Sequence, residues 1–134
     1  MAASEKKRLL LVDDEGPVLK LLKIRFEKMG HAVVIVDNGT DAMNIAKRLK
    51  PHVIVLDQLM PGKKGTEVCR ELKANPDTAR IPILFFTAHS GQGFEEACAE
   101  AGAAMVLYKP VVSDLIEAIQ KVFSGKRLDW LEDE

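Results

Sequence analysis

Five short aliphatic runs divide the chain at fairly regular intervals. Each run is continuous, without alternation of apolar and polar positions, which is typical of strands covered on both faces in a parallel sheet. The predicted strands are Leu9–Val12, Val33–Val36, Val53–Leu56, Ile83–Phe86 and Met105–Tyr108.

Segments with helical spacing of their apolar residues follow each of these runs. The predicted helices lie between Pro17 and Gly30, from about Asn38 to Leu49, from Thr66 to Lys73, from Phe94 to Ala101, and from about Leu115 to Phe123. Strand–helix alternation repeated five times predicts an α/β domain, a doubly wound five-stranded parallel sheet with five helices and right-handed crossovers.

Length and charge narrow the classes of protein. A chain of 134 residues is expected to form one domain. The 19 basic and 20 acidic residues nearly cancel, so bulk charge suggests no nucleic-acid or membrane surface. The aliphatic runs are too short for a membrane span or a signal peptide. Cys69 and Cys98 complete no metal or redox motif, which predicts buried thiols in a cytoplasmic protein.

Charged and hydroxyl side chains follow four of the five predicted strands. Open α/β sheets bind ligands outside the carboxyl ends of their strands, so these side chains are expected to meet at one edge. They are Asp13, Asp14 and Glu15 after the first strand, Asp57 after the third, Thr87 after the fourth and Lys109 after the fifth.

This combination of groups suits phosphoryl chemistry. Carboxylates within ~4–6 Å of one another repel and favour a bound cation, and Mg²⁺ prefers such oxygen ligands. An aspartate beside Mg²⁺ can attack a phosphoryl group and form an acyl phosphate. Asp14 is then the predicted metal ligand and Asp57 the predicted acceptor. An ammonium from Lys109 and a hydroxyl from Thr87 would stabilise the phosphoryl oxygens.

Each of these residues alone also has a purely structural interpretation. Asp13 or Asp14 could cap a helix, and Asp57 could open a turn. Thr87 is an ordinary strand-end residue, and a lysine is most often a solvated surface charge. It is their joint arrangement at four strand ends that indicates a functional site.

Four motifs in order resemble the receiver domain of bacterial two-component response regulators. They are Leu-Val-Asp-Asp-Glu at 11–15, Asp57-Gln-Leu-Met-Pro-Gly-Lys-Lys-Gly65, Phe86-Thr87-Ala88 and Lys109-Pro110. The resemblance covers residues 7–124, leaving an N-terminal extension at 1–6 and a short charged tail at 125–134. It implies a flavodoxin-like sheet with strand order 2-1-3-4-5.

The resemblance also implies the roles of the residues after the strands. Asp57 would accept a phosphoryl group from a sensor histidine kinase or a histidine-phosphotransfer protein, with Mg²⁺ required. Asp14, Asp57 and the backbone carbonyl of Leu59 would bind the metal, and Asp13 would support it through water. Lys109, Thr87 and the backbone N–H of Ala88 would contact the phosphoryl group.

Three further features follow from the same resemblance. Met60-Pro61 and Gly65 would shape the loop after the acceptor, with a positive φ at Gly65. The bond from Lys109 to Pro110 would be cis, as is common in the family. Phosphorylation would reposition an output face, roughly residues 89–124, that binds an unknown downstream protein.

The sequence departs from the family pattern at one position. Val106 stands three residues before the lysine, where many receivers carry Tyr or Phe, while Tyr108 lies two positions further on the same strand face. Leu59 and His89 would flank the path of attacking water, although His89 is also interpretable as an exposed loop residue. His31 and His52 lie at strand entrances and receive no role, and Trp130 could dock on the domain or on a partner.

Rival chemistries lack key residues. A haloacid-dehalogenase-type hydrolase needs an acid two residues after its nucleophile, where this chain has Leu59. The phosphate loops of flavin, dinucleotide and P-loop proteins are absent from the sequence. We therefore expect no enzyme beyond catalysis of its own phosphorylation and dephosphorylation. Two alternatives stay open: a phosphorylation-independent binding module, and a fragment of a larger regulator or hybrid kinase. The oligomeric state is also open between a monomer and a phosphorylation-dependent homodimer.

Overall fold

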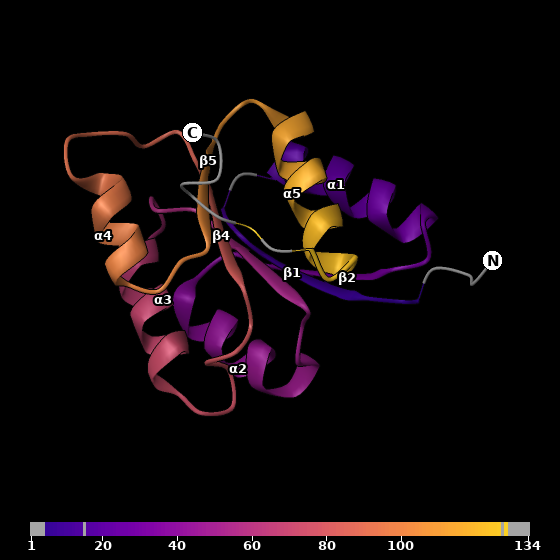
Figure 1. Cartoon of the computed structure of the whole chain (residues 1–134), viewed down its shortest axis with the longest axis horizontal. Helices are drawn as coiled ribbons and strands as arrows, with labels where there is room; N and C mark the ends of the chain where they lie inside the picture. Colours follow the sequence, from indigo (N-terminus) through magenta and orange to yellow (C-terminus); the bar gives the residue numbers. More distant parts are fainter. Residues whose placement is uncertain (1–4, 15, 127, 129–134) are drawn as a thin grey trace.

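The computed structural model describes residues 5–14, 16–126 and 128. Strands and helices alternate throughout this part of the chain (Figure 1). The strands are β1 (Arg8–Val12), β2 (Ala32–Val36), β3 (Val53–Leu56), β4 (Ile83–Thr87) and β5 (Met105–Tyr108). The helices are α1 (Gly16–Lys28), α2 (Gly39–Leu49), α3 (Gly65–Ala74), α4 (Phe94–Glu100) and α5 (Val112–Phe123). Every predicted strand and helix is confirmed, with ends that differ by a few residues.

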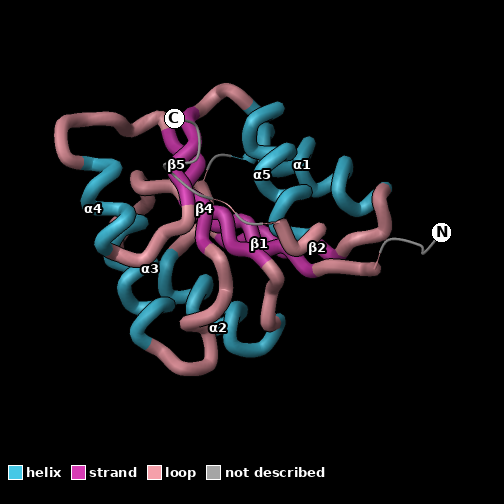
Figure 2. Tube along the Cα trace, viewed as in Figure 1, coloured by secondary structure: helices cyan, strands magenta, loops and turns pink. Residues whose placement is uncertain are grey.

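The five strands form one parallel sheet in the order β2-β1-β3-β4-β5. Helices α1 and α5 cover one face, and α2, α3 and α4 cover the other (Figures 1 and 2). The predicted doubly wound α/β class and its strand order are therefore confirmed. This order places the carboxyl ends of β1, β3, β4 and β5 side by side along one edge of the sheet.

Two hydrophobic layers explain why the strand sequences are continuously apolar. Along β1, Leu9 and Leu11 face the α1–α5 layer, whereas Leu10 and Val12 face the layer of α2, α3 and α4. The central strands β3 and β4 alternate in the same way, and all nine of their residues are buried. Because both faces are covered, every position of these strands has to be apolar or hydrogen-bonded.

The ends of the domain meet at the opposite edge of the sheet. The backbone N–H of Lys7 donates to His31 Nδ1 at 3.0 Å, and that of Arg8 donates to His52 Nδ1 at 3.0 Å. The ring of Phe123, at the end of α5, lies 4.7 Å from the His31 ring between centroids. The two histidines therefore have a structural role at this edge that the sequence did not reveal.

Some sequence predictions fall outside the described residues. Trp130, Glu15, residues 1–4 and most of the tail after Lys126 belong to this group. Both cysteines are buried and neither forms a disulfide. None of the helices in the described part of the chain combines the length and apolar character needed to span a bilayer.

Candidate phosphoacceptor site

Three carboxylates converge from the ends of two neighbouring strands. Asp13 and Asp14 follow β1, and Asp57 follows β3. The ladder between these strands continues past their ends, since the Asp57 N–H donates to the Val12 carbonyl at 3.0 Å. One oxygen of each carboxylate lies within 4.8 Å of the other two. Asp13 and Asp57 are only 5% and 4% exposed, so two negative charges are held together largely out of water.

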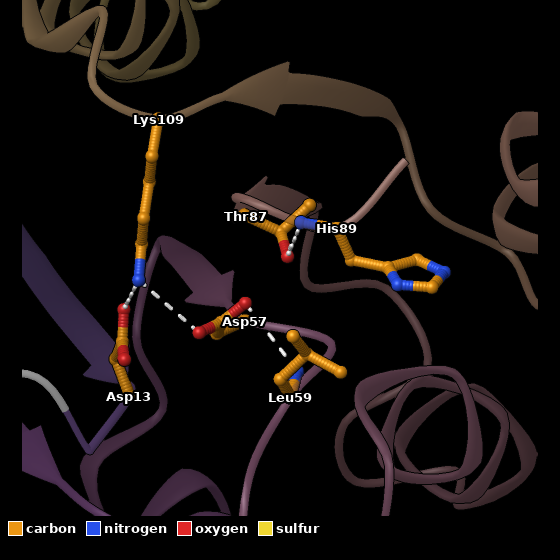
Figure 3. A network of polar contacts seen from close by, with 6 residues as sticks. All are labelled: Asp13, Asp57, Leu59, Thr87, His89 and Lys109. Atoms are coloured by element: carbon orange, nitrogen blue, oxygen red, sulfur yellow. Dashed lines mark hydrogen bonds and ion pairs between the residues drawn. The ribbon is translucent and has the colours of Figure 1, made fainter. Parts of the chain in front are cut away.

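Lys109 supplies the positive charge that this arrangement needs. Its ammonium lies 2.8 Å from Asp13 Oδ2 and 3.1 Å from Asp57 Oδ2, as Figure 3 shows. The lysine follows β5 and therefore reaches across the end of β4 to the two aspartates. Carboxylates buried without such a partner would be costly, so the lysine contributes to the fold as well as to the site.

Thr87 is the last residue of β4 and lies at the same edge of the sheet. Its side chain is fully buried, and its Oγ accepts a hydrogen bond from the His89 N–H at 3.1 Å. The His89 ring points away from Asp57 in Figure 3 and packs against Phe94, with 4.7 Å between ring centroids. His89 therefore lies in the loop after β4, as predicted, but its ring is partly buried against α4 instead of exposed, and it points away from Asp57.

The loop after Asp57 forms one wall of the site. The Leu59 N–H donates to Asp57 Oδ1 at 3.4 Å, and the Leu59 side chain is 53% exposed. A hollow of about 380 Å³ opens beside it. The residues that line the hollow are Asp14, Gln58, Leu59, Met60, Pro61, Gly62 and Lys64.

Gly65 is required for a reason other than the one predicted. Its φ is not positive, and the glycine with positive φ in this loop is Gly62, at 82°. A Cβ built on Gly65 would lie 2.4 Å from the Asp57 carbonyl oxygen and 2.9 Å from the Phe85 ring. The prediction of positive φ at Gly65 was therefore wrong. This position excludes a side chain because the first turn of α3 packs directly on the backbone of Asp57 and Gln58.

Tyr108 occupies the face that the strand period predicts. It packs with Val106 against the core beneath α4, and it pairs in register with Thr87 of the neighbouring strand. Its hydroxyl donates to the Glu95 carboxylate on α4. Burial and this hydrogen bond raise the pKa of Tyr108 to about 12. The tyrosine therefore ties β5 to α4 as a neutral phenol.

The structure brings the predicted site residues Asp13, Asp14, Asp57, Thr87 and Lys109 to one edge of the sheet. Leu59 and Ala88 follow β3 and β4 at the same edge. The Lys109–Pro110 bond is cis, as the resemblance implied. Gln58 was not predicted as part of the site, although its side chain is buried next to Asp57 in the chain.

The donor set also fits a divalent cation. Three carboxylates offer hard oxygen ligands, two of them almost buried and the third, Asp14, exposed. Mg²⁺ prefers such ligands and keeps several waters, which an exposed carboxylate at the rim allows. An acidic pocket of this kind is where the receiver family binds Mg²⁺.

A doubly wound sheet that gathers three carboxylates, a threonine and a lysine at its strand ends defines a receiver-type α/β protein. Residues 9–120 match the family model of the response regulator receiver domain, and the chain belongs to this family.

Two relatives contain a similar domain in chains of different length. Response regulator PleD of Caulobacter vibrioides is 35% identical over 127 residues, which cover 95% of this chain but 28% of PleD. Protein PilH of Pseudomonas aeruginosa is 33% identical over 119 residues, which cover 88% of this chain and 98% of PilH. The chain thus spans little more than a quarter of one relative and nearly all of another.

A solved structure with the same fold comes from a third context. It is the signal receiver domain of a signal transduction histidine kinase from Syntrophus aciditrophicus, with a TM-score of 0.79 and 30% identity. The match covers 89% of this chain and 91% of that one.

Proposed function

We propose that this protein is a phosphoacceptor switch of a two-component phosphorelay, in which Asp57 receives a phosphoryl group from a phosphohistidine donor. The donor is a sensor histidine kinase or a histidine-phosphotransfer protein. The observation that carries the proposal is the contact of the Lys109 ammonium with both Asp13 and Asp57 beside the third carboxylate of Asp14.

In the transfer step, an Asp57 carboxylate oxygen attacks the phosphorus atom. The new O–P bond forms as the P–N bond to the donor imidazole breaks, and the ring nitrogen keeps the electron pair of that bond and takes up a proton from solvent. Lys109 already lies 3.1 Å from the acceptor carboxylate, so its ammonium can follow the charge onto the phosphoryl oxygens. The Thr87 hydroxyl accepts from the His89 N–H, which leaves its own proton available for a phosphoryl oxygen.

The remaining contacts of the product come from the loops. The backbone N–H of Ala88 would donate to a phosphoryl oxygen. Asp14, Asp57 and the Leu59 carbonyl would hold Mg²⁺, with Asp13 supporting it through water. When bound, the cation offsets negative charge on the carboxylates and on the phosphoryl group. On these residues, the protein catalyses only its own phosphorylation and dephosphorylation.

Output is proposed to pass through protein contacts in the cytoplasm, as a monomer or as a homodimer that forms on phosphorylation. The acyl phosphate adds nearly two negative charges beside Thr87 and Lys109. Because Thr87 pairs in register with Tyr108, and Tyr108 bonds to Glu95, a chain of contacts leads from the acceptor to α4. That chain supports residues 89–124 as the face that binds the downstream partner.

Intact-mass analysis after incubation with acetyl phosphate tests the acceptor. The wild type should gain one phosphoryl adduct of about 80 Da that requires Mg²⁺. Asp57→Asn should gain none. Asp77→Asn is the matched control, because Asp77 is an exposed aspartate just before β4, at the other end of the strands from the site, and it should be modified like the wild type.

Absence of the adduct from the wild type would favour a phosphorylation-independent binding module. The relatives also support a second possibility within the same function. Because the chain covers 28% of PleD, and a similar domain belongs to a histidine kinase, the receiver can be a fragment of a larger regulator or hybrid kinase. The adduct experiment gives the same result in either context.

A further inference from the structure

The side chain next to the proposed acceptor is buried in a contact that phosphoryl transfer does not use. Gln58 is 7% exposed and lies against Thr66, which is 9% exposed, in the first turn of α3. Gln58 Oε1 accepts from the Thr66 N–H at 2.8 Å, and Gln58 Nε2 donates to Thr66 Oγ1 at 3.4 Å. We call this pair of contacts the Gln58 clamp.

The backbone of Gln58 is held at the same place. Its carbonyl accepts from the Gly65 N–H at 3.0 Å. The first N–H groups of a helix have no partner within the helix. Gln58 therefore satisfies two of these groups of α3, one through its backbone and one through its side chain. The missing Cβ of Gly65 allows this close approach.

These bonds close the loop that carries Leu59. The chain leaves the sheet at Asp57 and returns to residues 65 and 66, so the Gln58 clamp fixes the start of the loop against its end. Leu59 follows directly, and its N–H donates to Asp57 Oδ1. The orientation of the peptide between Gln58 and Leu59 is thereby set on both sides.

We propose that Gln58 is a positioning residue for the cation site, because its amide holds the start of the loop from which the Leu59 carbonyl would bind Mg²⁺. This inference rests on the proposed function. Residues that orient metal ligands without touching the ion commonly change affinity by 10- to 100-fold when they are replaced. Gln58 would act in this way through hydrogen bonds to the backbone of α3.

Calorimetric titration of the full chain with Mg²⁺, without any phosphodonor, tests the inference. Gln58→Met keeps the length of the side chain and removes its hydrogen bonds, so it should raise the Mg²⁺ dissociation constant by about 10-fold or more. Gln120→Met makes the same replacement at an exposed position of α5 and should leave the constant unchanged. Urea unfolding of each variant establishes that it is folded during the titration.

A conservative replacement separates positioning from general loss of packing. Gln58→Glu retains an oxygen that can accept from the Thr66 N–H and adds negative charge near the cation, so it should bind Mg²⁺ no more weakly than the wild type. If Gln58→Met fails to fold, Gln58→Asn takes its place, because its amide is one methylene too short for the clamp. It should likewise weaken Mg²⁺ binding.

Phosphorylation gives an independent readout. With acetyl phosphate, Gln58→Met should need about 10-fold more Mg²⁺ for half-maximal adduct formation and approach the wild-type rate at saturating Mg²⁺. Wild-type Mg²⁺ affinity in this variant, or equal weakening in Gln58→Met and Gln58→Glu, would overturn the inference and leave the proposed function intact. A wild type that neither binds Mg²⁺ nor forms the adduct would overturn both.

Discussion

At the scale of single residues, the site buries charged side chains, which is unfavourable unless an opposite charge lies close by. Asp13 and Asp57 are nearly out of water and share one ammonium, that of Lys109. Each carboxylate repels the other, and the exposed Asp14 adds to the negative potential. The fold tolerates this because the lysine, 11% exposed at its side chain, is held at hydrogen-bond distance from both acids.

Removal of this ammonium should destabilise the protein. Lys109→Met should lower the free energy of unfolding in metal-free buffer by about 2–4 kcal/mol, because two buried carboxylates lose their counter-charge. Urea denaturation measures the change. Asp13→Asn in the same background should recover part of the loss. Lys20→Met, at an exposed position of α1, should stay within about 0.5 kcal/mol of the wild type. Equal stability of Lys109→Met and the wild type would show that the ion pairs carry no net stabilisation.

Residue-scale features differ in how far the sequence reveals them. The positions of Asp13, Asp57 and Lys109 are predictable because each follows an aliphatic run that only a buried strand explains. The contact of Gln58 with Thr66 is not, since a glutamine after an aspartate has no pattern that distinguishes burial from exposure. Gly65 was identified as necessary but for the wrong cause, because close packing of two backbones leaves no local signature.

At the scale of elements, the entry of β1 depends on two neutral histidines. His31 and His52 each accept a backbone N–H through Nδ1, which a protonated imidazole cannot do. Burial, first, and the nearby Lys7 lower the pKa of His31, while burial and then Arg8 lower that of His52. These two hydrogen bonds cannot be predicted from the sequence, because the donors lie 24 and 44 residues away from the histidines.

These lowered pKa values predict a pH-dependent stability. The histidines of the unfolded chain bind protons near pH 6.5, whereas those of the folded chain bind them only at lower pH. A fall in pH therefore stabilises the unfolded state relative to the folded state. The free energy of unfolding should therefore be highest above about pH 7 and decrease as pH falls through 6.5 and below. Urea unfolding between pH 7.5 and 5.5 measures this slope.

Asparagine provides the control for this effect. The double variant His31→Asn, His52→Asn keeps an acceptor on a short side chain and removes both titrating groups, so its slope over the same pH range should be shallower. Gln120→Asn makes a comparable replacement at an exposed position of α5 that carries no titrating group, so it should keep the wild-type slope. An unchanged slope in the double variant would assign the pH dependence to other groups.

Among the elements themselves, sequence periodicity was most informative for the strands. Continuous burial on both faces produces the aliphatic runs, and the strand bounds agree to within one residue. The start of α5 was predicted less well. It begins at Val112, three residues before Leu115, the first residue of the helical stripe. Its first turn includes the exposed Ser113 and Asp114, so hydrophobic spacing alone cannot detect it.

At the scale of the whole molecule, cation binding and folding stability should be linked. The carboxylate cluster requires β1 and β3 to be paired, so the unfolded chain lacks it. A ligand that binds only the folded state at 100 times its dissociation constant stabilises that state by about 2.7 kcal/mol. Mg²⁺ at this ratio should raise the urea midpoint of the wild type accordingly.

The matched variants for this linkage are Asp14→Asn and Asp41→Asn. Asp14→Asn removes one proposed ligand at an exposed position and should lose most of the stabilisation by Mg²⁺. Asp41 lies exposed in the first turn of α2 and is absent from the carboxylate cluster, so Asp41→Asn should retain it. Equal stabilisation of all three proteins would mean that Mg²⁺ acts on the surface and not at the cluster.

The meeting of Lys7, His31 and Phe123 at the far edge of the sheet has a consequence for the topology of the chain. The start of β1 and the end of α5 lie close together, while Asp57 lies at the other end of the strands. A short peptide could join residues 124 and 7, and new termini could then open in an exposed loop. The same geometry lets the domain be inserted into a host protein through a pair of adjacent attachment points, with the edge that carries the carboxylate cluster left facing outward.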